Sequence, residues 1–318
     1  MGGFDAIRIG TFAVGLACIG LSVVPRIRSA DGLRTMGVDL RPVAVALAVG
    51  VVVGFAQAGP MLQLPTFFVI IQGSDPILAT VAIAPFVIAL LVAGPVSGYL
   101  PQRIGPRTLI AGGAIAVGVA NLVIAAVLDR QTGYPFFILP FLLIGAGFVI
   151  ATTVRTAIIF ASVPKGLPAS AAALNEASIG MGSRVGVVVA VVVTTQTALD
   201  SYAWTLQGIP SGLADTQVGY LRTLLNEFSL RSVAELTSGL DAATVKVYSD
   251  AVVDGMQTAA LIPGVVAVVT GIIAFILMGP RDPVRSVWDH ADERGPDPTG
   301  PPGVATGTPP SEGGVAST

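Results

Sequence analysis

The chain has 318 residues, of which 53% are hydrophobic and only 11% are charged. Soluble domains usually carry about 25% charged residues, so most of the folded surface is expected to face lipid instead of water. A single cysteine, Cys18, and a single histidine, His290, exclude internal disulfides and metal sites built from cysteine or clustered histidine. The net charge of −2 gives no indication of nucleic-acid binding, and we expect no metal and no cofactor.

Seven apolar runs, each of a length that suits a bilayer-spanning helix, follow one another along the chain. Their ranges are 9–24, 43–71, 77–100, 108–128, 134–160, 169–199 and 251–278. Helices satisfy the backbone hydrogen bonds that lipid leaves unpaired. The sequence therefore predicts an all-α membrane protein with about seven transmembrane helices. A cleaved signal peptide is the alternative for the short first run, although its positive charges follow the apolar core instead of preceding it.

The lysines and arginines near the predicted spans indicate an orientation. Ten of them fall on one side of the membrane: Arg26, Arg28, Arg34, Arg41, Arg103, Arg107, Lys165, Arg281, Arg285 and Arg294. The short segments on the other side hold only Arg8 and Arg130. Positive residues concentrate on the cytoplasmic side, and long loops such as 200–250 count little. We therefore expect a multi-pass protein of the plasma (inner) membrane, with its N-terminus outside and its C-terminus in the cytoplasm.

Composition divides the chain into three parts. Residues 1–42 are expected to form a transmembrane helix and a cytoplasmic connector, and residues 43–279 a six-helix bundle with an outer loop at 200–250. Apolar residues at helical spacing in 218–228, and Asp241 as an N-cap, predict two short amphipathic helices within that loop. The segment 280–318 is rich in Pro, Gly, Asp and Thr, and we expect it to be a disordered cytoplasmic tail.

Small residues recur at four-residue spacing in two of the spans, which favours close helix packing in lipid. They are Gly50, Gly54 and Ala58 in one span and Ser178, Gly182, Gly186 and Ala190 in the other. Prolines also occur within the spans, where they bend helices and free carbonyl groups. Either static kinks or the shaping of a transport cavity would account for them.

The turn between the third and fourth runs reads GYLPQRIGPR, from Gly98 to Arg107. It resembles the signature loop of the major facilitator superfamily of transporters, which usually reads G-x-L-x-D-R-x-G-x-R. The matching positions are Gly98, Arg103, Gly105 and Arg107, whereas Gln102 stands at the usual acidic position.

Two further segments resemble the fourteen-helix drug:proton antiporter branch of that superfamily. They are LPTFFVIIQGSDPILATVAIAP (Leu64 to Pro85) and SVPKGLPASAAALNEASIGMGSRVGVVVA (Ser162 to Ala190). The order of these motifs over residues 40–280 is similar to the carboxyl-terminal half of such a transporter. The resemblance implies that the transmembrane helix in residues 1–42 is a linker and that residues 43–279 are the C-terminal helical bundle. It also implies a small-molecule substrate, protons as the coupling ion, and alternating access.

No counterpart of the branch's amino-terminal six helices is recognisable in the sequence. We therefore expect a partial transporter, either a truncated reading frame or one half of a split protein whose amino-terminal half acts in trans. The alternative is a non-transporting membrane subunit that assembles with, or regulates, a full-length transporter. An enzyme is not expected, because no cluster of His, Asp or Glu lies in or beside a span.

Three charged residues, Arg155, Glu176 and Arg184, fall inside predicted spans. A charge costs roughly 2.5–3.5 kcal/mol or more at such a position, which makes each a candidate for substrate binding or coupling. Arg155 and Glu176 lie at similar depth on antiparallel spans, so they either form an ion pair or take part in proton or substrate coupling. Arg184 lies about 12 Å deeper, near the midplane, and is the leading candidate for the substrate site.

Overall fold

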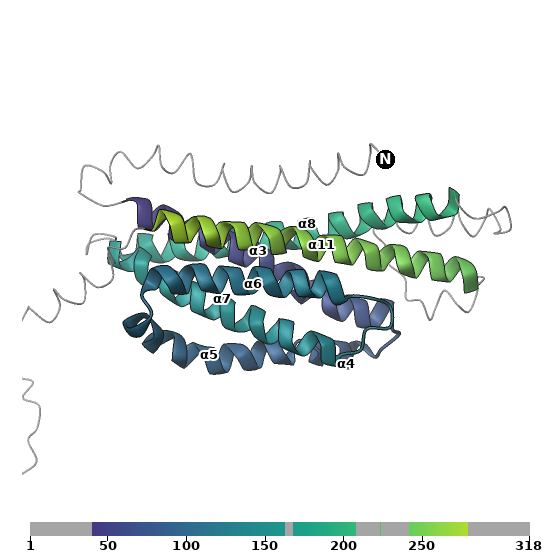
Figure 1. Ribbon diagram of the computed structural model, residues 1–318, viewed down its shortest axis with the longest axis horizontal. Coiled ribbons are helices and arrows are strands. Elements are labelled where there is room, and N and C mark those ends of the chain that lie inside the picture. Colours follow the sequence, from purple (N-terminus) through teal and green to yellow (C-terminus); the bar gives the residue numbers. More distant parts are fainter. Residues whose placement is uncertain (1–39, 163–167, 208–222, 224–241, 279–318) are drawn as a thin grey trace, which may run out of the picture.

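The computed structural model describes residues 40–162, 168–207, 223 and 242–278 (Figure 1). Within these residues the chain forms helices and no strand. The helices are α3 (Leu40–Ile70), α4 (Pro76–Val81), α5 (Ala84–Arg103), α6 (Pro106–Val127), α7 (Pro135–Ser162), α8 (Pro168–Gln207) and α11 (Ala242–Leu277). The all-α class predicted from the sequence is therefore confirmed.

The described residues contain six segments that are long and apolar enough to cross a membrane. They correspond to the last six of the seven expected spans, and the largest difference at an end is between residue 242 and the expected 251, about two and a half helical turns. The first expected span, 9–24, lies outside the described residues, as do the predicted helix at 218–228 and the tail 280–318. Those three predictions remain predictions.

The second described span is broken into α4 and α5, which the apolar pattern did not predict. Asp75 starts α4, because its side-chain oxygen accepts a hydrogen bond from the Ile77 amide at 2.7 Å. Pro85 stands at the first turn of α5. Its nitrogen carries no hydrogen and cannot donate to the carbonyl of Val81, four residues earlier, so the hydrogen-bond ladder of α4 is interrupted there.

The helices pack around α3, which contacts α7, α8 and α11. Helix α6 packs against α7 and α11, while α5 packs mainly against α7. In Figure 1, α5 lies along one side of the bundle and α8 and α11 lie along the other. The spans that include α5 and α8 are the least buried of the six, with 33% of their most apolar window buried in each case. These two helices therefore present the largest uncovered faces of the described bundle.

The small-residue stripe predicted from the sequence forms the contact between α3 and α8. A Cβ atom at Gly182 would overlap the carbonyl oxygen of Val51, and one at Gly186 would lie 2.5 Å from the carbonyl oxygen of Phe55. On the other helix, a Cβ at Gly54 would lie 2.7 Å from the carbonyl oxygen of Ile179. The two backbones approach so closely that larger side chains do not fit.

A proline in α3 is matched by an amide on α6. Pro60 lies inside α3 and has no N–H to donate to the carbonyl of Ala56, four residues earlier. The Nδ2 atom of Asn121, a fully buried residue, donates to that carbonyl at 3.1 Å and to the Val117 carbonyl of its own helix at 2.8 Å. In lipid, where water cannot reach the freed carbonyl, this side chain takes the place of the missing backbone donor.

Helices α8 and α11 are longer than a membrane requires. They contain 40 and 36 residues, which at about 1.5 Å per residue gives roughly 60 and 54 Å, against a hydrocarbon core of about 30 Å. Figure 1 shows both helices extending past the others at one end. Here Ser201 donates to Asp254 at 2.6 Å, and Tyr202 and Tyr248 are buried.

This extension corrects one expectation about the outer loop. The second amphipathic helix, predicted to follow Asp241 as a separate element, is the first part of the continuous helix α11. Between Ala242 and Leu261 there is no proline and Gly255 is the single glycine, and one glycine costs too little to end a helix that is packed along its length. Asp241 itself lies outside the described residues.

Candidate functional site

A cavity of about 390 Å³ opens between α7 and α8. Its walls are Phe148, Thr152, Thr153, Thr156, Asn175, Glu176 and Ile179. Five of these seven side chains are polar, although both helices belong to membrane-spanning segments. Polar groups in a span ordinarily face the bundle interior or a water-filled path, so this cavity is the candidate site for a transported molecule.

The three threonines come from one stretch of α7 and are held in place by hydrogen bonds. The hydroxyl of Thr152 donates to the Phe148 carbonyl at 2.8 Å, and that of Thr156 donates to the Thr152 carbonyl at 2.7 Å. On α5, Ser97 lies 3.0 Å from the Thr153 hydroxyl and fixes its position. Because each hydroxyl oxygen can also accept hydrogen bonds, this wall of the cavity can receive donors from a bound molecule.

The opposite wall is the polar pair Asn175 and Glu176 on α8. The Asn175 side-chain oxygen lies 3.2 Å from the Thr156 hydroxyl, which joins the two helices across the cavity. Its Nδ2 atom donates to a carboxylate oxygen of Glu176 at 3.5 Å, a long and weak hydrogen bond. Glu176 is exposed in the described chain and is the one ionisable residue among those that line the cavity. Its carboxylate is therefore available to a bound cation, a hydrogen-bond donor or a proton.

Arg155 lies behind this wall and is completely buried. Its Nη1 atom donates to the Ser178 hydroxyl at 2.5 Å and its Nη2 atom to the Asn175 carbonyl at 3.1 Å, while Nε has no partner. The direct ion pair with Glu176 that the matched depths suggested is absent: the described residues contain only the pair Arg130–Asp250, at 2.5 Å.

The reason is the direction of the Arg155 side chain. Matched depth along two helices fixes the height of two side chains but not the direction in which each points. The guanidinium enters the seam between α3 and α8, beside Gly50 and Ser178. Glu176 belongs to the cavity wall instead. Among the hydrogen bonds of the described residues, Asn175 links the two, because its backbone carbonyl accepts from Arg155 and its side-chain amide donates to Glu176.

Arg184, the leading candidate from the sequence, lies apart from this cavity. It is not among the lining residues, and its side chain is exposed on α8. Within the described part of the chain it has no hydrogen bond and no ion pair. An unpaired arginine on the uncovered face of a membrane helix requires a partner that the described bundle does not supply.

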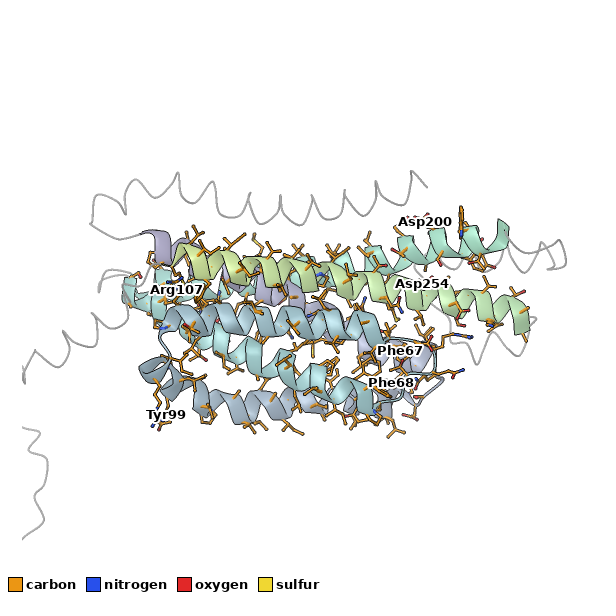
Figure 2. All side chains as sticks on the ribbon, in the orientation of Figure 1. Phe67, Phe68, Tyr99, Arg107, Asp200 and Asp254 are labelled. Atoms are coloured by element: carbon orange, nitrogen blue, oxygen red, sulfur yellow. The ribbon has the colours of Figure 1, made fainter. Side chains whose placement is uncertain are left out.

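The signature-loop residues lie at the end of the bundle where α5 ends and α6 begins. Gly105 has φ 54°, a left-handed conformation that suits glycine in the tight turn between the two helices. The guanidinium of Arg107 lies 4.0 Å from the centre of the Phe275 ring, which ties α6 to the end of α11 (Figure 2 labels Arg107). Arg103 and Gly98 are exposed on α5. The described contacts give this loop a role in packing and turn geometry.

Sequence reasoning identified the charged residue of the cavity but missed its hydroxyls. Thr152, Thr153 and Thr156 occur within five positions of an otherwise apolar run. Spacings of three and four place such residues close together on one side of a helix. This pattern was a usable signal, although threonines that bond to their own helix produce the same pattern with no cavity beside them.

The chain is similar to transport proteins of bacteria, among them the following two. It is 24% identical over 243 residues to the Multidrug efflux pump LfrA of Mycolicibacterium smegmatis (strain ATCC 700084 / mc(2)155), an alignment that covers 76% of this chain and 46% of the relative. It is 25% identical over 152 residues to the Tetracenomycin C resistance and export protein of Streptomyces glaucescens, covering 46% of this chain and 27% of that protein. No protein-family model matches the chain.

These similarities support a membrane transporter in general. Both names describe efflux or export, and neither describes an enzyme. The chain spans less than half the length of each of these curated relatives. The activity of a whole transporter is therefore a matter for proposal.

Proposed function

We propose that this chain is part of a membrane transporter that exports drugs or small metabolites, and that the α7–α8 cavity is one wall of its substrate path. The observation that carries the proposal is the gathering of three threonines, Asn175 and Glu176 around one cavity within membrane-spanning helices. Hydroxyl, amide and carboxylate groups suit a lipophilic molecule that also bears hydrogen-bond donors or a positive charge. The similarity to efflux and export proteins supports the same assignment.

Coupling to protons is assigned to Glu176. A carboxylate exchanges protons readily, and this one lines the cavity in which a substrate would bind. If a proton and a cationic substrate compete for Glu176, entry of the proton from one side releases the substrate on that side. Rocking of two helical bundles around the cavity then completes alternating access.

A second helical bundle is the proposed partner, supplied by an amino-terminal half in trans or in the same chain. Its proposed place is over the face that holds the α7–α8 cavity, with the least buried spans, those of α5 and α8, at the two edges of that face. Arg184 lies exposed on α8. Placing an arginine side chain in lipid near the membrane midplane costs at least about 2.5–3.5 kcal/mol, so a polar partner surface is favoured there. Arg184 then faces the space between the two bundles and becomes a second candidate for substrate binding.

The alternative proposal is a membrane subunit that assembles with, or regulates, a full-length transporter without transporting anything itself. The exposed Arg184 favours it as much as the first proposal, since it requires a partner in either case. The two proposals differ in whether the α7–α8 cavity binds a transported substrate. Replacement of Glu176 separates them, because a purely regulatory subunit does not need that carboxylate.

The test is transport into liposomes with an imposed proton gradient, using ethidium and a panel of other fluorescent lipophilic compounds. The chain alone should give no transport, whereas the chain completed by a matching amino-terminal half should give gradient-driven transport. In the completed protein Glu176→Gln should abolish it, while the exposed acid Asp254, which does not line the cavity, should tolerate Asp254→Asn.

Three outcomes would count against these assignments. Transport by the lone chain would contradict the need for a second bundle. Transport that survives Glu176→Gln at full rate would remove the α7–α8 cavity from the mechanism. Transport unaffected by Arg184→Ala would remove Arg184 as a binding residue.

A further inference from the structure

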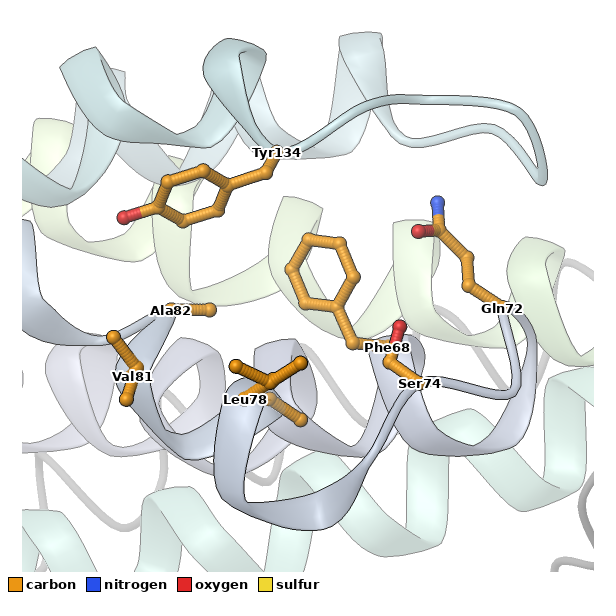
Figure 3. A pocket seen from close by; sticks show the side chains of 8 residues that line it. Phe68, Gln72, Ser74, Leu78, Val81, Ala82 and Tyr134 are labelled. Carbon is orange, nitrogen blue, oxygen red and sulfur yellow. The ribbon is translucent and has the colours of Figure 1, made fainter.

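A second cavity, of about 330 Å³, lies at the end of the bundle where α3 ends and α4 begins (Figure 3). It is lined by Phe68, Gln72, Ser74, Leu78, Ala79, Val81, Ala82 and Tyr134. It shares no residue with the α7–α8 cavity and differs from it in character, because its walls are mostly apolar and contain no charged residue.

The backbone around this cavity is fixed by local hydrogen bonds. Gly73, with φ 64°, allows the chain to reverse after α3, and the Ser74 amide donates to the Phe68 carbonyl at 2.9 Å. Across the mouth, the side chain of Gln72 donates to the Thr132 carbonyl at 2.8 Å, which fastens this turn to the connector before α7. The cavity is therefore preformed, as small-molecule sites usually are.

Aromatic rings form one side of the cavity. The rings of Phe68 and Tyr134 are 6.2 Å apart and inclined at 60°, and Phe137 lies 5.8 Å from Phe68 behind them. Figure 3 shows the Phe68 ring between Tyr134 and the side chains of α4. Facing the rings, Leu78 and Val81 are 68% and 58% exposed and form an aliphatic rim. A flat ring that enters between the rim and the aromatic side meets edge and face contacts of the kind aromatic pairs prefer.

Three polar side chains line the cavity: Gln72, Ser74 and Tyr134. Because Gln72 uses its Nε2 to bind Thr132, its side-chain oxygen remains as an acceptor, and Figure 3 shows that oxygen on the side of Phe68. The hydroxyl groups of Ser74 and Tyr134 can each donate or accept a hydrogen bond. None of these three side chains offers a full charge to a ligand, so binding an ion here would leave that ion without a counter-charge.

We propose that this cavity binds an uncharged, planar aromatic molecule of about two fused rings that carries a hydrogen-bond donor. The volume lies at the lower end of the range for small-molecule sites, the aromatic side supplies ring contacts, and Gln72 supplies the acceptor. This site is separate from the proposed substrate path and does not depend on transport activity. A lipid acyl chain is the competing occupant, which the aromatic contacts and the acceptor disfavour.

The experiment is photolabelling of the full chain in lipid nanodiscs with 1-azidonaphthalene, followed by mass spectrometry of the labelled peptides. Labelling of the residues around Phe68, Leu78 and Tyr134 should saturate and should be displaced by excess 2-naphthol. Decahydro-2-naphthol, which keeps the hydroxyl but lacks the aromatic rings, and the anion 2-naphthoate should displace it about tenfold less effectively.

Two tryptophan variants provide the matched comparison. Leu78→Trp places a large ring in the mouth of the cavity and should lower the saturable labelling about tenfold. Leu91→Trp makes the same change on the neighbouring helix α5, at a residue that is 72% exposed and does not line the cavity, and should leave it unchanged. Both positions are at the surface, so both variants should fold, which elution as a single species would verify.

Equal displacement by decahydro-2-naphthol would overturn the proposal in favour of an aliphatic occupant such as an acyl chain. Equal displacement by 2-naphthoate would overturn the proposal that the cavity selects uncharged ligands. Labelling that does not saturate, or that Leu78→Trp leaves unchanged, would show that the probe merely samples the lipid-facing surface.

Discussion

The guanidinium of Arg155 occupies the space that a side chain at Gly50 would fill. Arg155 belongs to α7 and Gly50 to α3, and the guanidinium ends beside Ser178 of α8. One glycine thus allows a buried cation to reach hydrogen-bond acceptors across the tightest helix seam of the described bundle. The same cation holds the Asn175 carbonyl, next to the carboxylate of the candidate site.

Substitution of Gly50 by alanine should therefore destabilise the protein by about 1–3 kcal/mol, because the added methyl group forces Arg155 or α3 to move. The change in thermal unfolding temperature in detergent would measure it. Gly112→Ala is the control, since a Cβ there meets no atom within 4 Å apart from its chain neighbours and the nearby backbone of its own helix. That substitution should be neutral or slightly stabilising, as expected for glycine to alanine in a helix.

The cause can be separated from a general weakening of α3. In an Arg155→Ala background, the cost of Gly50→Ala should fall by more than half, because the space beside Gly50 is then free. An unchanged cost in that background would show that Gly50 acts through another neighbour.

A second prediction concerns the partner of the buried arginine. Ser178→Ala should cost about 1–3 kcal/mol, because it leaves Nη1 of Arg155 buried without its acceptor. Glu176→Gln should cost less, because Glu176 is exposed and makes no ion pair with Arg155 among the described residues. A double-mutant cycle in detergent compares the coupling of Arg155 with each residue. Stronger coupling of Arg155 to Glu176 than to Ser178 would support the ion pair that the matched depths of Arg155 and Glu176 in their spans suggested.

A third prediction concerns the amide that replaces a missing backbone donor. Asn121→Leu should destabilise the protein by about 1–3 kcal/mol, because it leaves the Ala56 carbonyl without a partner inside the bundle. In a Pro60→Ala background the alanine N–H can bond to Ala56 itself, so the same substitution should cost less there. Chemical denaturation of the four proteins measures the difference. An equal cost in both backgrounds would show that Asn121 contributes through its other contacts.

Much of the fold could be predicted from the sequence because lipid leaves few alternatives. An apolar run of about 20 residues in a bilayer forms a helix, and all six runs in the described residues do so. The Gly182 and Gly186 stripe was also predictable, since small residues at four-residue spacing have one common use in membranes. The break before Pro85 and the extensions to Gln207 and from Ala242 depend on local backbone geometry and on packing outside the apolar runs.

The candidate site was only partly predictable. Charge alone singles out Glu176 and Arg155, because ionisable residues are rare within spans. It cannot say that Arg155 turns away from the carboxylate into the seam beside Gly50, or that Arg184 lies exposed on α8. Those features depend on the rotation of each helix about its axis, which tertiary contacts set.

The last prediction concerns orientation, which rests on the distribution of arginine and lysine in the short connectors. The structure adds a constraint: the hydrogen bond from Gln72 to the Thr132 carbonyl places the connectors at 71–75 and 128–134 at the same end of the bundle. In a Cys18→Ala background, cysteines at Ser74 and at Gln131 should therefore both react with an impermeant thiol reagent added to intact cells. A cysteine at Ser162, at the end of α7, should react only after the membrane is opened.

If the cysteines at positions 74 and 131 react only in opened membranes, the topology is inverted and the fold is left intact. Labelling of one but not the other would contradict the Gln72–Thr132 contact itself, and labelling around Arg103 in intact cells would overturn the cytoplasmic assignment of the signature loop.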